Sequence, residues 1–385
     1  MNKVIYFDNN STTHLLPEVK KILQEAIEGD IGNPESLDRF GKEANVLVEQ
    51  SRLYIASLLS TSPNKLLFTS SGSESNTIAI YSAIKNSSRR RIVCSQIEHT
   101  SIQRTFELLK LEDYDVQIIR VLPSGTIDLD HAETLIDENT ALVSVQLVNN
   151  ETGVIQPIQR ISECAESVGA KFHCDGAQAI GKISFSIEKL GCDYFTFTAH
   201  KIHGPKGIGC IWTRGKTEEI FPLIPGGSQE QGRRGGTHNV LGIIGFGIAA
   251  KIRKASISSV IDHTSLLRDT FEEIILRELP STIINGKESP RVSNTTNMQF
   301  SEIDGKALFL RLLQQDIICS QSSACTAQYP EPSKILRAMG LTYEEAFNSI
   351  RFSFSELNTL QEVTIAAKTI TDTYRYIQNK LGPGW

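Results

Sequence analysis

Short apolar runs alternate with amphipathic stretches along the chain from about residue 66 to residue 215. The apolar runs have the length of strands, and we expect strands at Leu66–Thr69, Arg91–Ser95, 116–121, 141–148, 171–174, Tyr194–Thr198 and 209–212. Helix-like stretches lie between several of them, at residues 74–85, 101–111 and 158–168. Such alternation requires crossover connections, so it predicts an α/β fold on a mostly parallel, seven-stranded sheet buried on both faces.

Polar residues follow these predicted strands directly. They are Ser71-Gly72-Ser73, Glu98-His99, Asn149-Asn150-Glu151, Asp175-Gly176-Ala177-Gln178 and Ala199-His200-Lys201. In an open α/β sheet the ligand crevice lies outside the carboxyl ends of the strands. We therefore expect five loops from distant parts of the chain to converge on one site.

The pattern changes after residue 250, where longer amphipathic stretches cover residues 265–279, 304–315, 333–339 and 359–381. A chain of 385 residues is long enough for two hydrophobic cores. We predict a large domain at residues 14–250. A smaller α+β domain would combine residues 1–13 with residues 251–385.

Composition restricts the compartment and the partners. The hydrophobic share of 40% is that of an ordinary soluble protein, and the net charge of −5 gives no footprint for nucleic acid. The N-terminus lacks the apolar core of a signal peptide. The longest apolar run, residues 240–250, is far short of the ~20 residues that a membrane span needs. We expect a cytoplasmic protein with no membrane partner and no direct nucleic-acid partner.

The seven cysteines form no C-x-x-C pair, which argues against a disulfide framework and against a structural zinc site. We predict no metal. Cys94, Cys174 and Cys210 lie in apolar runs, where cysteine is usually a small buried hydrophobe. Cys325 differs from them, because it lies in the small, polar, loop-like run 321–328.

Several residues after the strands have a catalytic and a structural interpretation. Gly72 and Ser73 open a predicted helix, where free N–H groups could cradle a phosphate, or Ser73 could simply cap the helix. Lys201 at a strand end could lose its proton and form a Schiff base, although most lysines are solvated. Asp175 could hold a pyridinium nitrogen or cap a helix.

His99 and Arg351 have the same ambiguity. His99 could stack on a ring or move protons, or it could be a satisfied structural histidine. Arg351 lies in a strand-like run, where a partly buried guanidinium needs an acidic partner. A substrate carboxylate or a structural carboxylate would serve equally well.

Taken together, these segments resemble the NifS/IscS-type cysteine desulfurases, which are class V aminotransferase-like enzymes of the pyridoxal phosphate (PLP) transferase fold type I. The resemblance covers nearly the whole chain, and its motifs occur in the family's order and spacing. The matching segments are residues 6–13, 32–34, 68–76, 148–153, 173–178, 200–207, 323–326, 331–333 and 349–353. Gly176 stands where the family more often has Ala.

The resemblance implies a role for each residue around pyridoxal 5'-phosphate. Lys201 would carry the cofactor and act on the substrate Cα proton, His99 would stack on the ring, and Asp175 would pair with the ring nitrogen. Gln178 would contact the phenolic oxygen, and Asn150 would contact the cofactor and, with Arg351, bind the substrate carboxylate. The phosphate would be held by Gly72, Ser73, Thr198 and His200, and by Thr237 from the neighbouring subunit of a homodimer.

The implied reaction is the desulfuration of L-cysteine. The Cys325 thiolate would attack the substrate sulfur, which leaves a persulfide on the enzyme and releases L-alanine. The sulfur would pass to an acceptor protein for iron–sulfur cluster assembly or thiolation. An aminotransferase needs no nucleophilic cysteine, so Ser323-Ala324-Cys325-Thr326 argues against that activity. A selenocysteine lyase and a non-catalytic, PLP-binding regulatory protein remain the alternatives.

Overall fold

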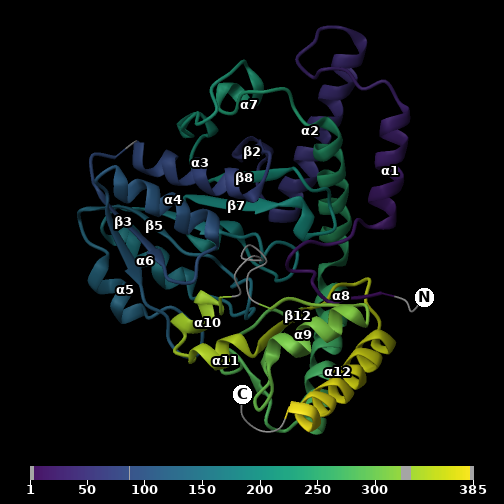
Figure 1. The fold of residues 1–385 in the computed structure, drawn as a ribbon. Helices are drawn as coiled ribbons and strands as arrows, with labels where there is room; N and C mark the ends of the chain where they lie inside the picture. The colour runs from purple at the N-terminus through teal and green to yellow at the C-terminus, as the bar shows by residue number, and fades with distance from the viewer. Residues whose placement is uncertain (1–3, 86, 322–330, 382–385) are drawn as a thin grey trace.

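The computed structural model describes residues 4–85, 87–321 and 331–381. Its main feature is a seven-stranded sheet in the order β2-β8-β7-β6-β5-β3-β4 (Figure 1). The strands are β2 (Leu66–Thr69), β3 (Arg91–Ser95), β4 (Asp115–Ile119), β5 (Thr140–Ser144), β6 (Lys171–Asp175), β7 (Tyr194–Thr198) and β8 (Gly209–Thr213). In this sheet β8 runs opposite in direction to the other six strands. The predicted mostly parallel α/β sheet is confirmed.

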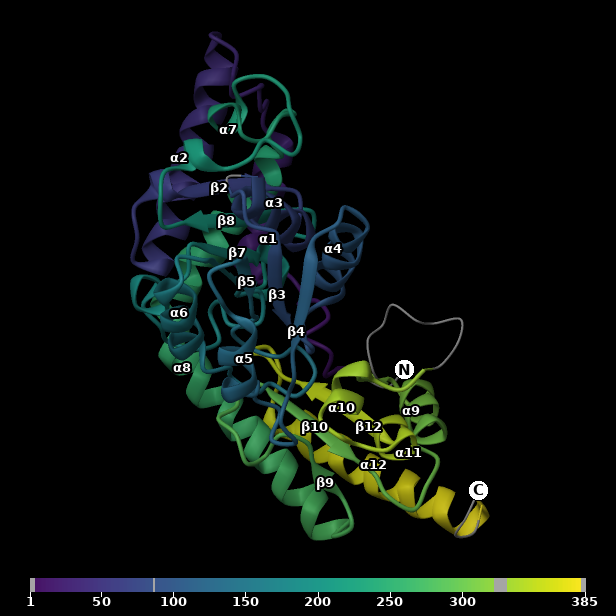
Figure 2. The ribbon, with the colours of Figure 1, turned by 90° about the vertical axis from the view of Figure 1, so that its left-hand side faces the viewer.

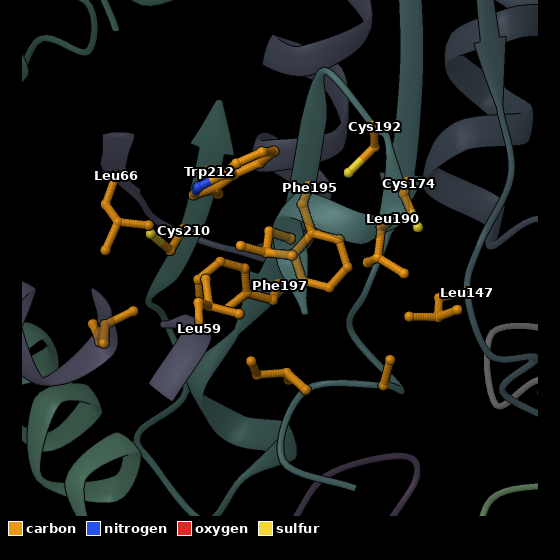
Figure 3. Close-up of a cluster of buried hydrophobic side chains, with 14 of the residues drawn as sticks. Leu59, Leu66, Leu147, Cys174, Leu190, Cys192, Phe195, Phe197, Cys210 and Trp212 are labelled. Carbon is orange, nitrogen blue, oxygen red and sulfur yellow. The ribbon is translucent and has the colours of Figure 1, made fainter. Parts of the chain in front are cut away.

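Helices cover both faces of this sheet, which explains why β2, β5, β7 and β8 are buried along their whole length. On β7, Tyr194 packs in one core with α3 (Gly72–Lys85) and α4 (Thr100–Leu111). Phe195 and Phe197 point to the opposite core (Figure 3). That second core also contains residues from α2 (Arg39–Leu59), α6 (Ile158–Ser167) and the first part of α8 (Val240–Glu278).

The part of the molecule that contains the large sheet also has three further helices and several 3-10 turns in its described residues. The helices are α1 (Pro17–Glu28), α5 (Leu129–Leu135) and α7 (Gln229–Gly232). The 3-10 turns are η1 (Pro63–Lys65), η2 (Ile187–Leu190), η3 (Ala199–Lys201) and η4 (Thr217–Glu219). Among these, η3 matters for function, because it directly follows β7 and ends on Lys201.

A smaller antiparallel sheet, ordered β12-β10-β9, lies below the large one (Figures 1 and 2). It consists of β9 (Ile283–Ile284), β10 (Thr295–Gln299) and β12 (Ser349–Ser353), while β1 (Ile5–Tyr6) pairs separately with β11 (Ile317–Ile318). The helices here are α9 (Gly305–Gln314), α10 (Lys334–Ala338), α11 (Tyr343–Phe347) and α12 (Leu360–Leu381). This part has its own core, which includes Phe271, Phe300, Phe352 and Phe354.

The helix α8 is continuous over 39 residues and joins the two cores. Ile243 and Phe246 pack in the large core, whereas Leu267 and Phe271 pack in the small one. The predicted domain boundary at residue 250 therefore falls inside a helix, and the expected separate helix at 265–279 is the end of α8. None of the helices in the described ranges is long and apolar enough to cross a membrane.

The N-terminal segment runs from the small core to the end of the large sheet. Ile5 pairs with Ile317, and Asp8 forms a bridge to Ser353. A few residues later, the backbone N–H of Thr13 donates to the carbonyl oxygen of His200 at 3.0 Å. The segment thus brings Asn10 close to the residues that follow β7.

Candidate active site

Lys201 is the centre of the polar cluster at the carboxyl ends of β6 and β7. Its Nζ donates to the carbonyl oxygens of Asn10, at 2.5 Å, and Ser11, at 2.8 Å. Burial, and then the nearby charge of Arg351, lower the pKa of Lys201 to about 8. The amine is thus much easier to deprotonate than that of a solvated lysine, as formation of a Schiff base requires.

His99 is the N-cap residue of α4, on the same side of the sheet. Its Nδ1 accepts the backbone N–H of Ser101 at 3.1 Å. Burial lowers the pKa of the ring, so His99 is neutral at pH 7. Because Nδ1 acts as an acceptor, the neutral ring carries its proton on Nε2.

Asp175 is the last residue of β6, and both its oxygens accept hydrogen bonds. Oδ1 accepts the N–H of Ala177 at 2.8 Å, and Oδ2 accepts from Nδ2 of Asn76 at 2.9 Å. The carboxylate therefore closes a local turn and does not cap a helix, since no helix directly follows β6, and Asn76 of α3 also fixes its orientation. Each carboxylate oxygen still has a lone pair for a ligand.

The start of α3 forms the expected turn, with one change in the cap. The hydroxyl of Ser71, and not that of Ser73, accepts the N–H of Glu74 at 3.1 Å. Helix capping by Ser73 is thus wrong, since α3 already begins at Gly72. A Cβ added to Gly72 would lie 3.7 Å from the side chain of Thr198, so these two predicted phosphate ligands adjoin.

Thr198 and His200 differ in what they can offer a phosphate. The hydroxyl of Thr198 donates to the carbonyl of Ile208 at 2.8 Å, so its proton is already used. His200 faces the hydroxyl of Thr12 through Nδ1 at 3.2 Å. Burial, and then the charge of Lys201, lower the pKa of His200 to about 3, so this ring is neutral at pH 7.

Arg351 of β12 reaches the cluster from the small core. Its Nη1 donates to the carbonyl of Asn150 at 2.9 Å, and its Nη2 donates to Oδ1 of Asp8 at 2.6 Å. The acidic partner expected from the sequence is therefore present, and it is a structural one. Arg351 Nε and Asn150 Oδ1 are nevertheless buried without a hydrogen-bond partner. Arg351 Nε can therefore donate a hydrogen bond to a ligand, and Asn150 Oδ1 can accept one from it.

Two predicted residues are not part of this cluster. Thr237 is exposed and lines a separate cavity with Ser70 and Gly207, so within one chain it does not meet Lys201. Cys325 lies outside the described residues. The cluster therefore brings together Lys201, His99, Asp175, Gln178, His200, Asn150 and Arg351, with Gly72 and Ser73 at the start of α3 and Thr198 at the end of β7 beside them.

Sequence reasoning missed two residues that hold the cluster in place, Asn10 and Lys182. The carbonyl of Asn10 accepts from both Lys201 and Gln178, and its side chain accepts from Lys182. The only signal for Asn10 is its place in the N-terminal motif at residues 6–13, and nothing local distinguishes Lys182 from a solvated lysine. Glu98, which is expected here because it follows a strand, is buried, and desolvation raises the pKa of its carboxyl to about 8.

Comparisons with known proteins agree with this arrangement. Residues 5–365 match the aminotransferase class-V family. A cysteine desulfurase of Trichormus azollae is 39% identical over 361 residues, which is 94% of this chain and 90% of that one. A solved NifS-like protein from Rickettsia africae is 32% identical with a TM-score of 0.87, covering 97% of this chain and all of that one (100%).

A solved structure of SspA in complex with cysteine is 31% identical, with a TM-score of 0.80. The alignment covers 91% of this chain and 98% of that one. Both the fold and the sequence similarity thus extend over nearly the whole chain. The family predicted from the sequence is confirmed: the chain belongs to the aminotransferase class-V family, among the NifS-type cysteine desulfurases.

Proposed function

We propose that this chain is a PLP-dependent cysteine desulfurase, which transfers the sulfur of L-cysteine to Cys325 and releases L-alanine. One observation carries the proposal: a buried amine with a lowered pKa, Lys201, lies within electrostatic reach of Asp175 and Arg351. In such a reaction, Lys201 would react with the aldehyde of the cofactor, Asp175 would pair with its ring nitrogen, and Arg351 would bind the substrate carboxylate. The relative SspA, solved in complex with cysteine, supports L-cysteine as the substrate.

The donor set fits the cofactor. The first N–H groups of α3 lack partners within their helix and would hold the phosphate with His200 and, from a second subunit, Thr237. Asp175 would face the ring nitrogen, His99 would cover the ring, and Gln178 would reach the phenolic oxygen. The unpartnered Arg351 Nε and Asn150 Oδ1 would take the substrate. When bound, the cofactor supplies an electron sink for the substrate α carbon.

The residues of the chain then supply the proton chemistry. With a pKa of about 8, roughly a tenth of the Lys201 amine is neutral at pH 7, so it can remove a proton at Nζ. His99 holds its own proton on Nε2, away from the cap of α4. Asp8 and the carbonyl of Asn150 fix the Arg351 guanidinium, so it does not need to reorganise when a carboxylate arrives.

The sulfur step belongs to Cys325. An S–S bond forms between its thiolate and the substrate sulfur while the C–S bond of the substrate breaks. The two sulfur atoms are oxidised, and Cβ of the substrate takes up the electron pair and a proton to become the methyl group of alanine. The resulting persulfide is passed to an acceptor protein for iron–sulfur cluster assembly or thiolation, in the cytoplasm.

The active form is a homodimer, in which Thr237 of one chain completes the phosphate site of the other. The stretch that contains α1 and α2 supports this assembly, because it exposes large apolar side chains: Ile27, Leu37, Phe40, Val46 and Leu53. These helices project with α7 at one end of the molecule (Figures 1 and 2). The large and small domains divide near residue 250, within α8.

The test is an assay of the purified protein with PLP, L-cysteine and a reductant. We expect a visible cofactor band and release of equal amounts of alanine and sulfide. Cys325→Ala should keep the band and lose alanine release more than 100-fold. Cys164→Ala is the matched control, since Cys164 is a free and partly exposed cysteine, and it should behave as wild type.

Other outcomes would reject parts of the proposal. Alanine release that survives in Cys325→Ala removes the role of Cys325. A band without alanine release, but with turnover of selenocysteine, favours a selenocysteine lyase. A protein that shows no band with PLP is not a PLP enzyme.

A further inference from the structure

Lys182 is a second buried lysine next to the Lys201 cluster. It lies four residues after Gln178, and only 8% of its surface is exposed. Its Nζ donates to Oε1 of Gln178 at 2.6 Å and to Oδ1 of Asn10 at 2.8 Å. Both acceptors are neutral amide oxygens rather than carboxylates. Because lysine is rarely buried without a charged partner, this position requires an explanation beyond packing.

The two hydrogen bonds decide which way the amides point. An ammonium group has only hydrogens to offer, so it must face the oxygen of each amide and not the nitrogen. Nε2 of Gln178 is thereby turned away from Lys182. It donates one hydrogen to the carbonyl of Asn10 at 2.9 Å, which is the carbonyl that also accepts from Lys201. The second hydrogen of this amide remains for a ligand.

Asn10 is held in the same way. Its Oδ1 accepts from Lys182 and from Asn294 at 3.2 Å, and its Nδ2 donates to Thr295 at 2.8 Å. Lys182 therefore helps to orient both amides, although its own hydrogen bonds go to neither Lys201 nor the start of α3. Burial lowers the pKa of Lys182 well below its ordinary value, and the amine has a hydrogen for each of its two acceptors in either protonation state.

We propose that Lys182 is a positioning residue, which holds the oxygens of Gln178 and Asn10 so that an N–H of Gln178 faces the phenolic oxygen of the cofactor. The inference deepens the proposed function and rests on it. An N–H aimed at this oxygen stabilises its negative charge, which makes the nearby nitrogen of the Lys201–cofactor linkage easier to deprotonate. If Lys182 is lost, the Gln178 amide can rotate and present its oxygen instead.

The test is the pH titration of the visible cofactor band in the holoenzyme. In Lys182→Met and in Gln178→Leu, we expect the midpoint to rise by about 0.5 to 1 pH unit, the effect of one lost hydrogen bond. The double variant should rise no further than Gln178→Leu alone, because Lys182 acts through Gln178. Lys189→Met removes an exposed lysine seven residues away and should leave the midpoint unchanged.

Gln178→Glu covers the case in which Lys182→Met does not fold. The glutamate would pair with the Lys182 amine and keep that side of the network, but it has no N–H for the cofactor. Its midpoint should also rise, while its melting temperature should not fall. An unchanged midpoint in Gln178→Glu and in any folded Lys182→Met would overturn the proposal. So would a double variant whose shift is the sum of the two single shifts, since Lys182 would then act independently.

These results are separable from a failure of the proposed function. If the wild-type protein shows no visible band, PLP is not its cofactor, and the role of Lys182 is rejected with it. If the band is present but its midpoint is the same in the Lys182 and Gln178 variants as in the wild type, only the positioning role is rejected. A melting temperature that drops with no shift of the midpoint assigns Lys182 to packing alone.

Discussion

Lys201 is the side chain most changed by its surroundings. Its amine is held by two carbonyl oxygens and is buried near Arg351, whose positive charge further disfavours protonation. The protonated form is therefore destabilised relative to water, and this destabilisation activates the lysine. The same destabilisation of the protonated amine lowers the free energy of unfolding at neutral pH.

We expect the pH dependence of Lys201 to be visible in the apoprotein. The reactivity of its amine toward a reagent such as trinitrobenzenesulfonate should rise with a midpoint near pH 8, because the folded pKa is about 8. An unfolded lysine keeps its proton until about pH 10.4. The free energy of unfolding should therefore rise by up to about 1.4 kcal/mol per pH unit between these values, since the unfolded state binds more protons there.

Peptide mapping by mass spectrometry after a short pulse of reagent measures the modification of Lys201. The exposed Lys189 in the same digest is the internal control. Equal midpoints for the two lysines would contradict the activation of Lys201.

The residues predicted from the sequence are those that directly follow strands. Lys201, Asp175 and His99 could be found in this way, because the end of a strand marks the edge of the sheet. Lys182 and Asp8 could not. Their positions depend on packing between segments that are more than 150 residues apart, as in the bond from Lys182 to Asn10, and no local pattern reports such a contact.

Among the elements, buried strands were the easiest to predict and the long helix was the hardest. All seven strands of the large sheet lie where their apolar runs predict them, to within a few residues. Helix α8 was predicted only as an apolar run and a separate amphipathic stretch, since its apolar face changes partner from one core to the other. Strands of two residues, such as β1 and β9, carry no pattern at all.

In the turn after β6, a glycine makes room for a large side chain of the neighbouring strand β7. Gly176 stands where the family more often has Ala, and a Cβ added there would lie 1.8 Å from the ring of Phe195 in β7. We therefore expect Gly176→Ala to lower the free energy of unfolding by about 1–3 kcal/mol, the usual cost of overpacking. It should also weaken PLP binding, because Gly176 adjoins Asp175.

Phe195→Leu should relieve this clash, so the double variant should be more stable than Gly176→Ala alone. Urea unfolding and a fluorescence titration with PLP measure the two effects. Gly29→Ala is the control: its added Cβ would meet nothing closer than 3.6 Å, so its stability should stay within about 0.5 kcal/mol of wild type. A stable Gly176→Ala with normal PLP affinity would show that Phe195 moves freely.

At the scale of the whole molecule, the exposed apolar side chains of α2 predict its assembly. Phe40 is 48% exposed and Val46 is 66% exposed. We expect Phe40→Glu/Val46→Glu to convert a dimer into monomers, because charges would be buried in the interface. The affinity for PLP should fall as well, since Thr237 would no longer reach a neighbouring site.

Light scattering after size-exclusion chromatography measures the change. Ile365→Glu on α12 is the matched control, because Ile365 is also about half exposed, at 49%. It should leave the dimer intact. A wild-type protein that is monomeric at micromolar concentration would disprove the dimer, and with it the shared role of Thr237.

The path of the N-terminal segment also affects how the protein is made. This segment is translated well before β12, yet Asn10 bonds to Ser353, which is 343 positions further along the chain. The segment whose carbonyls hold Lys201 thus lacks this anchor until β12 has been synthesised. A nascent chain that stops before β12 therefore lacks the finished lysine site. Translation therefore has to reach β12 before any copy of the protein can form a complete site for sulfur transfer.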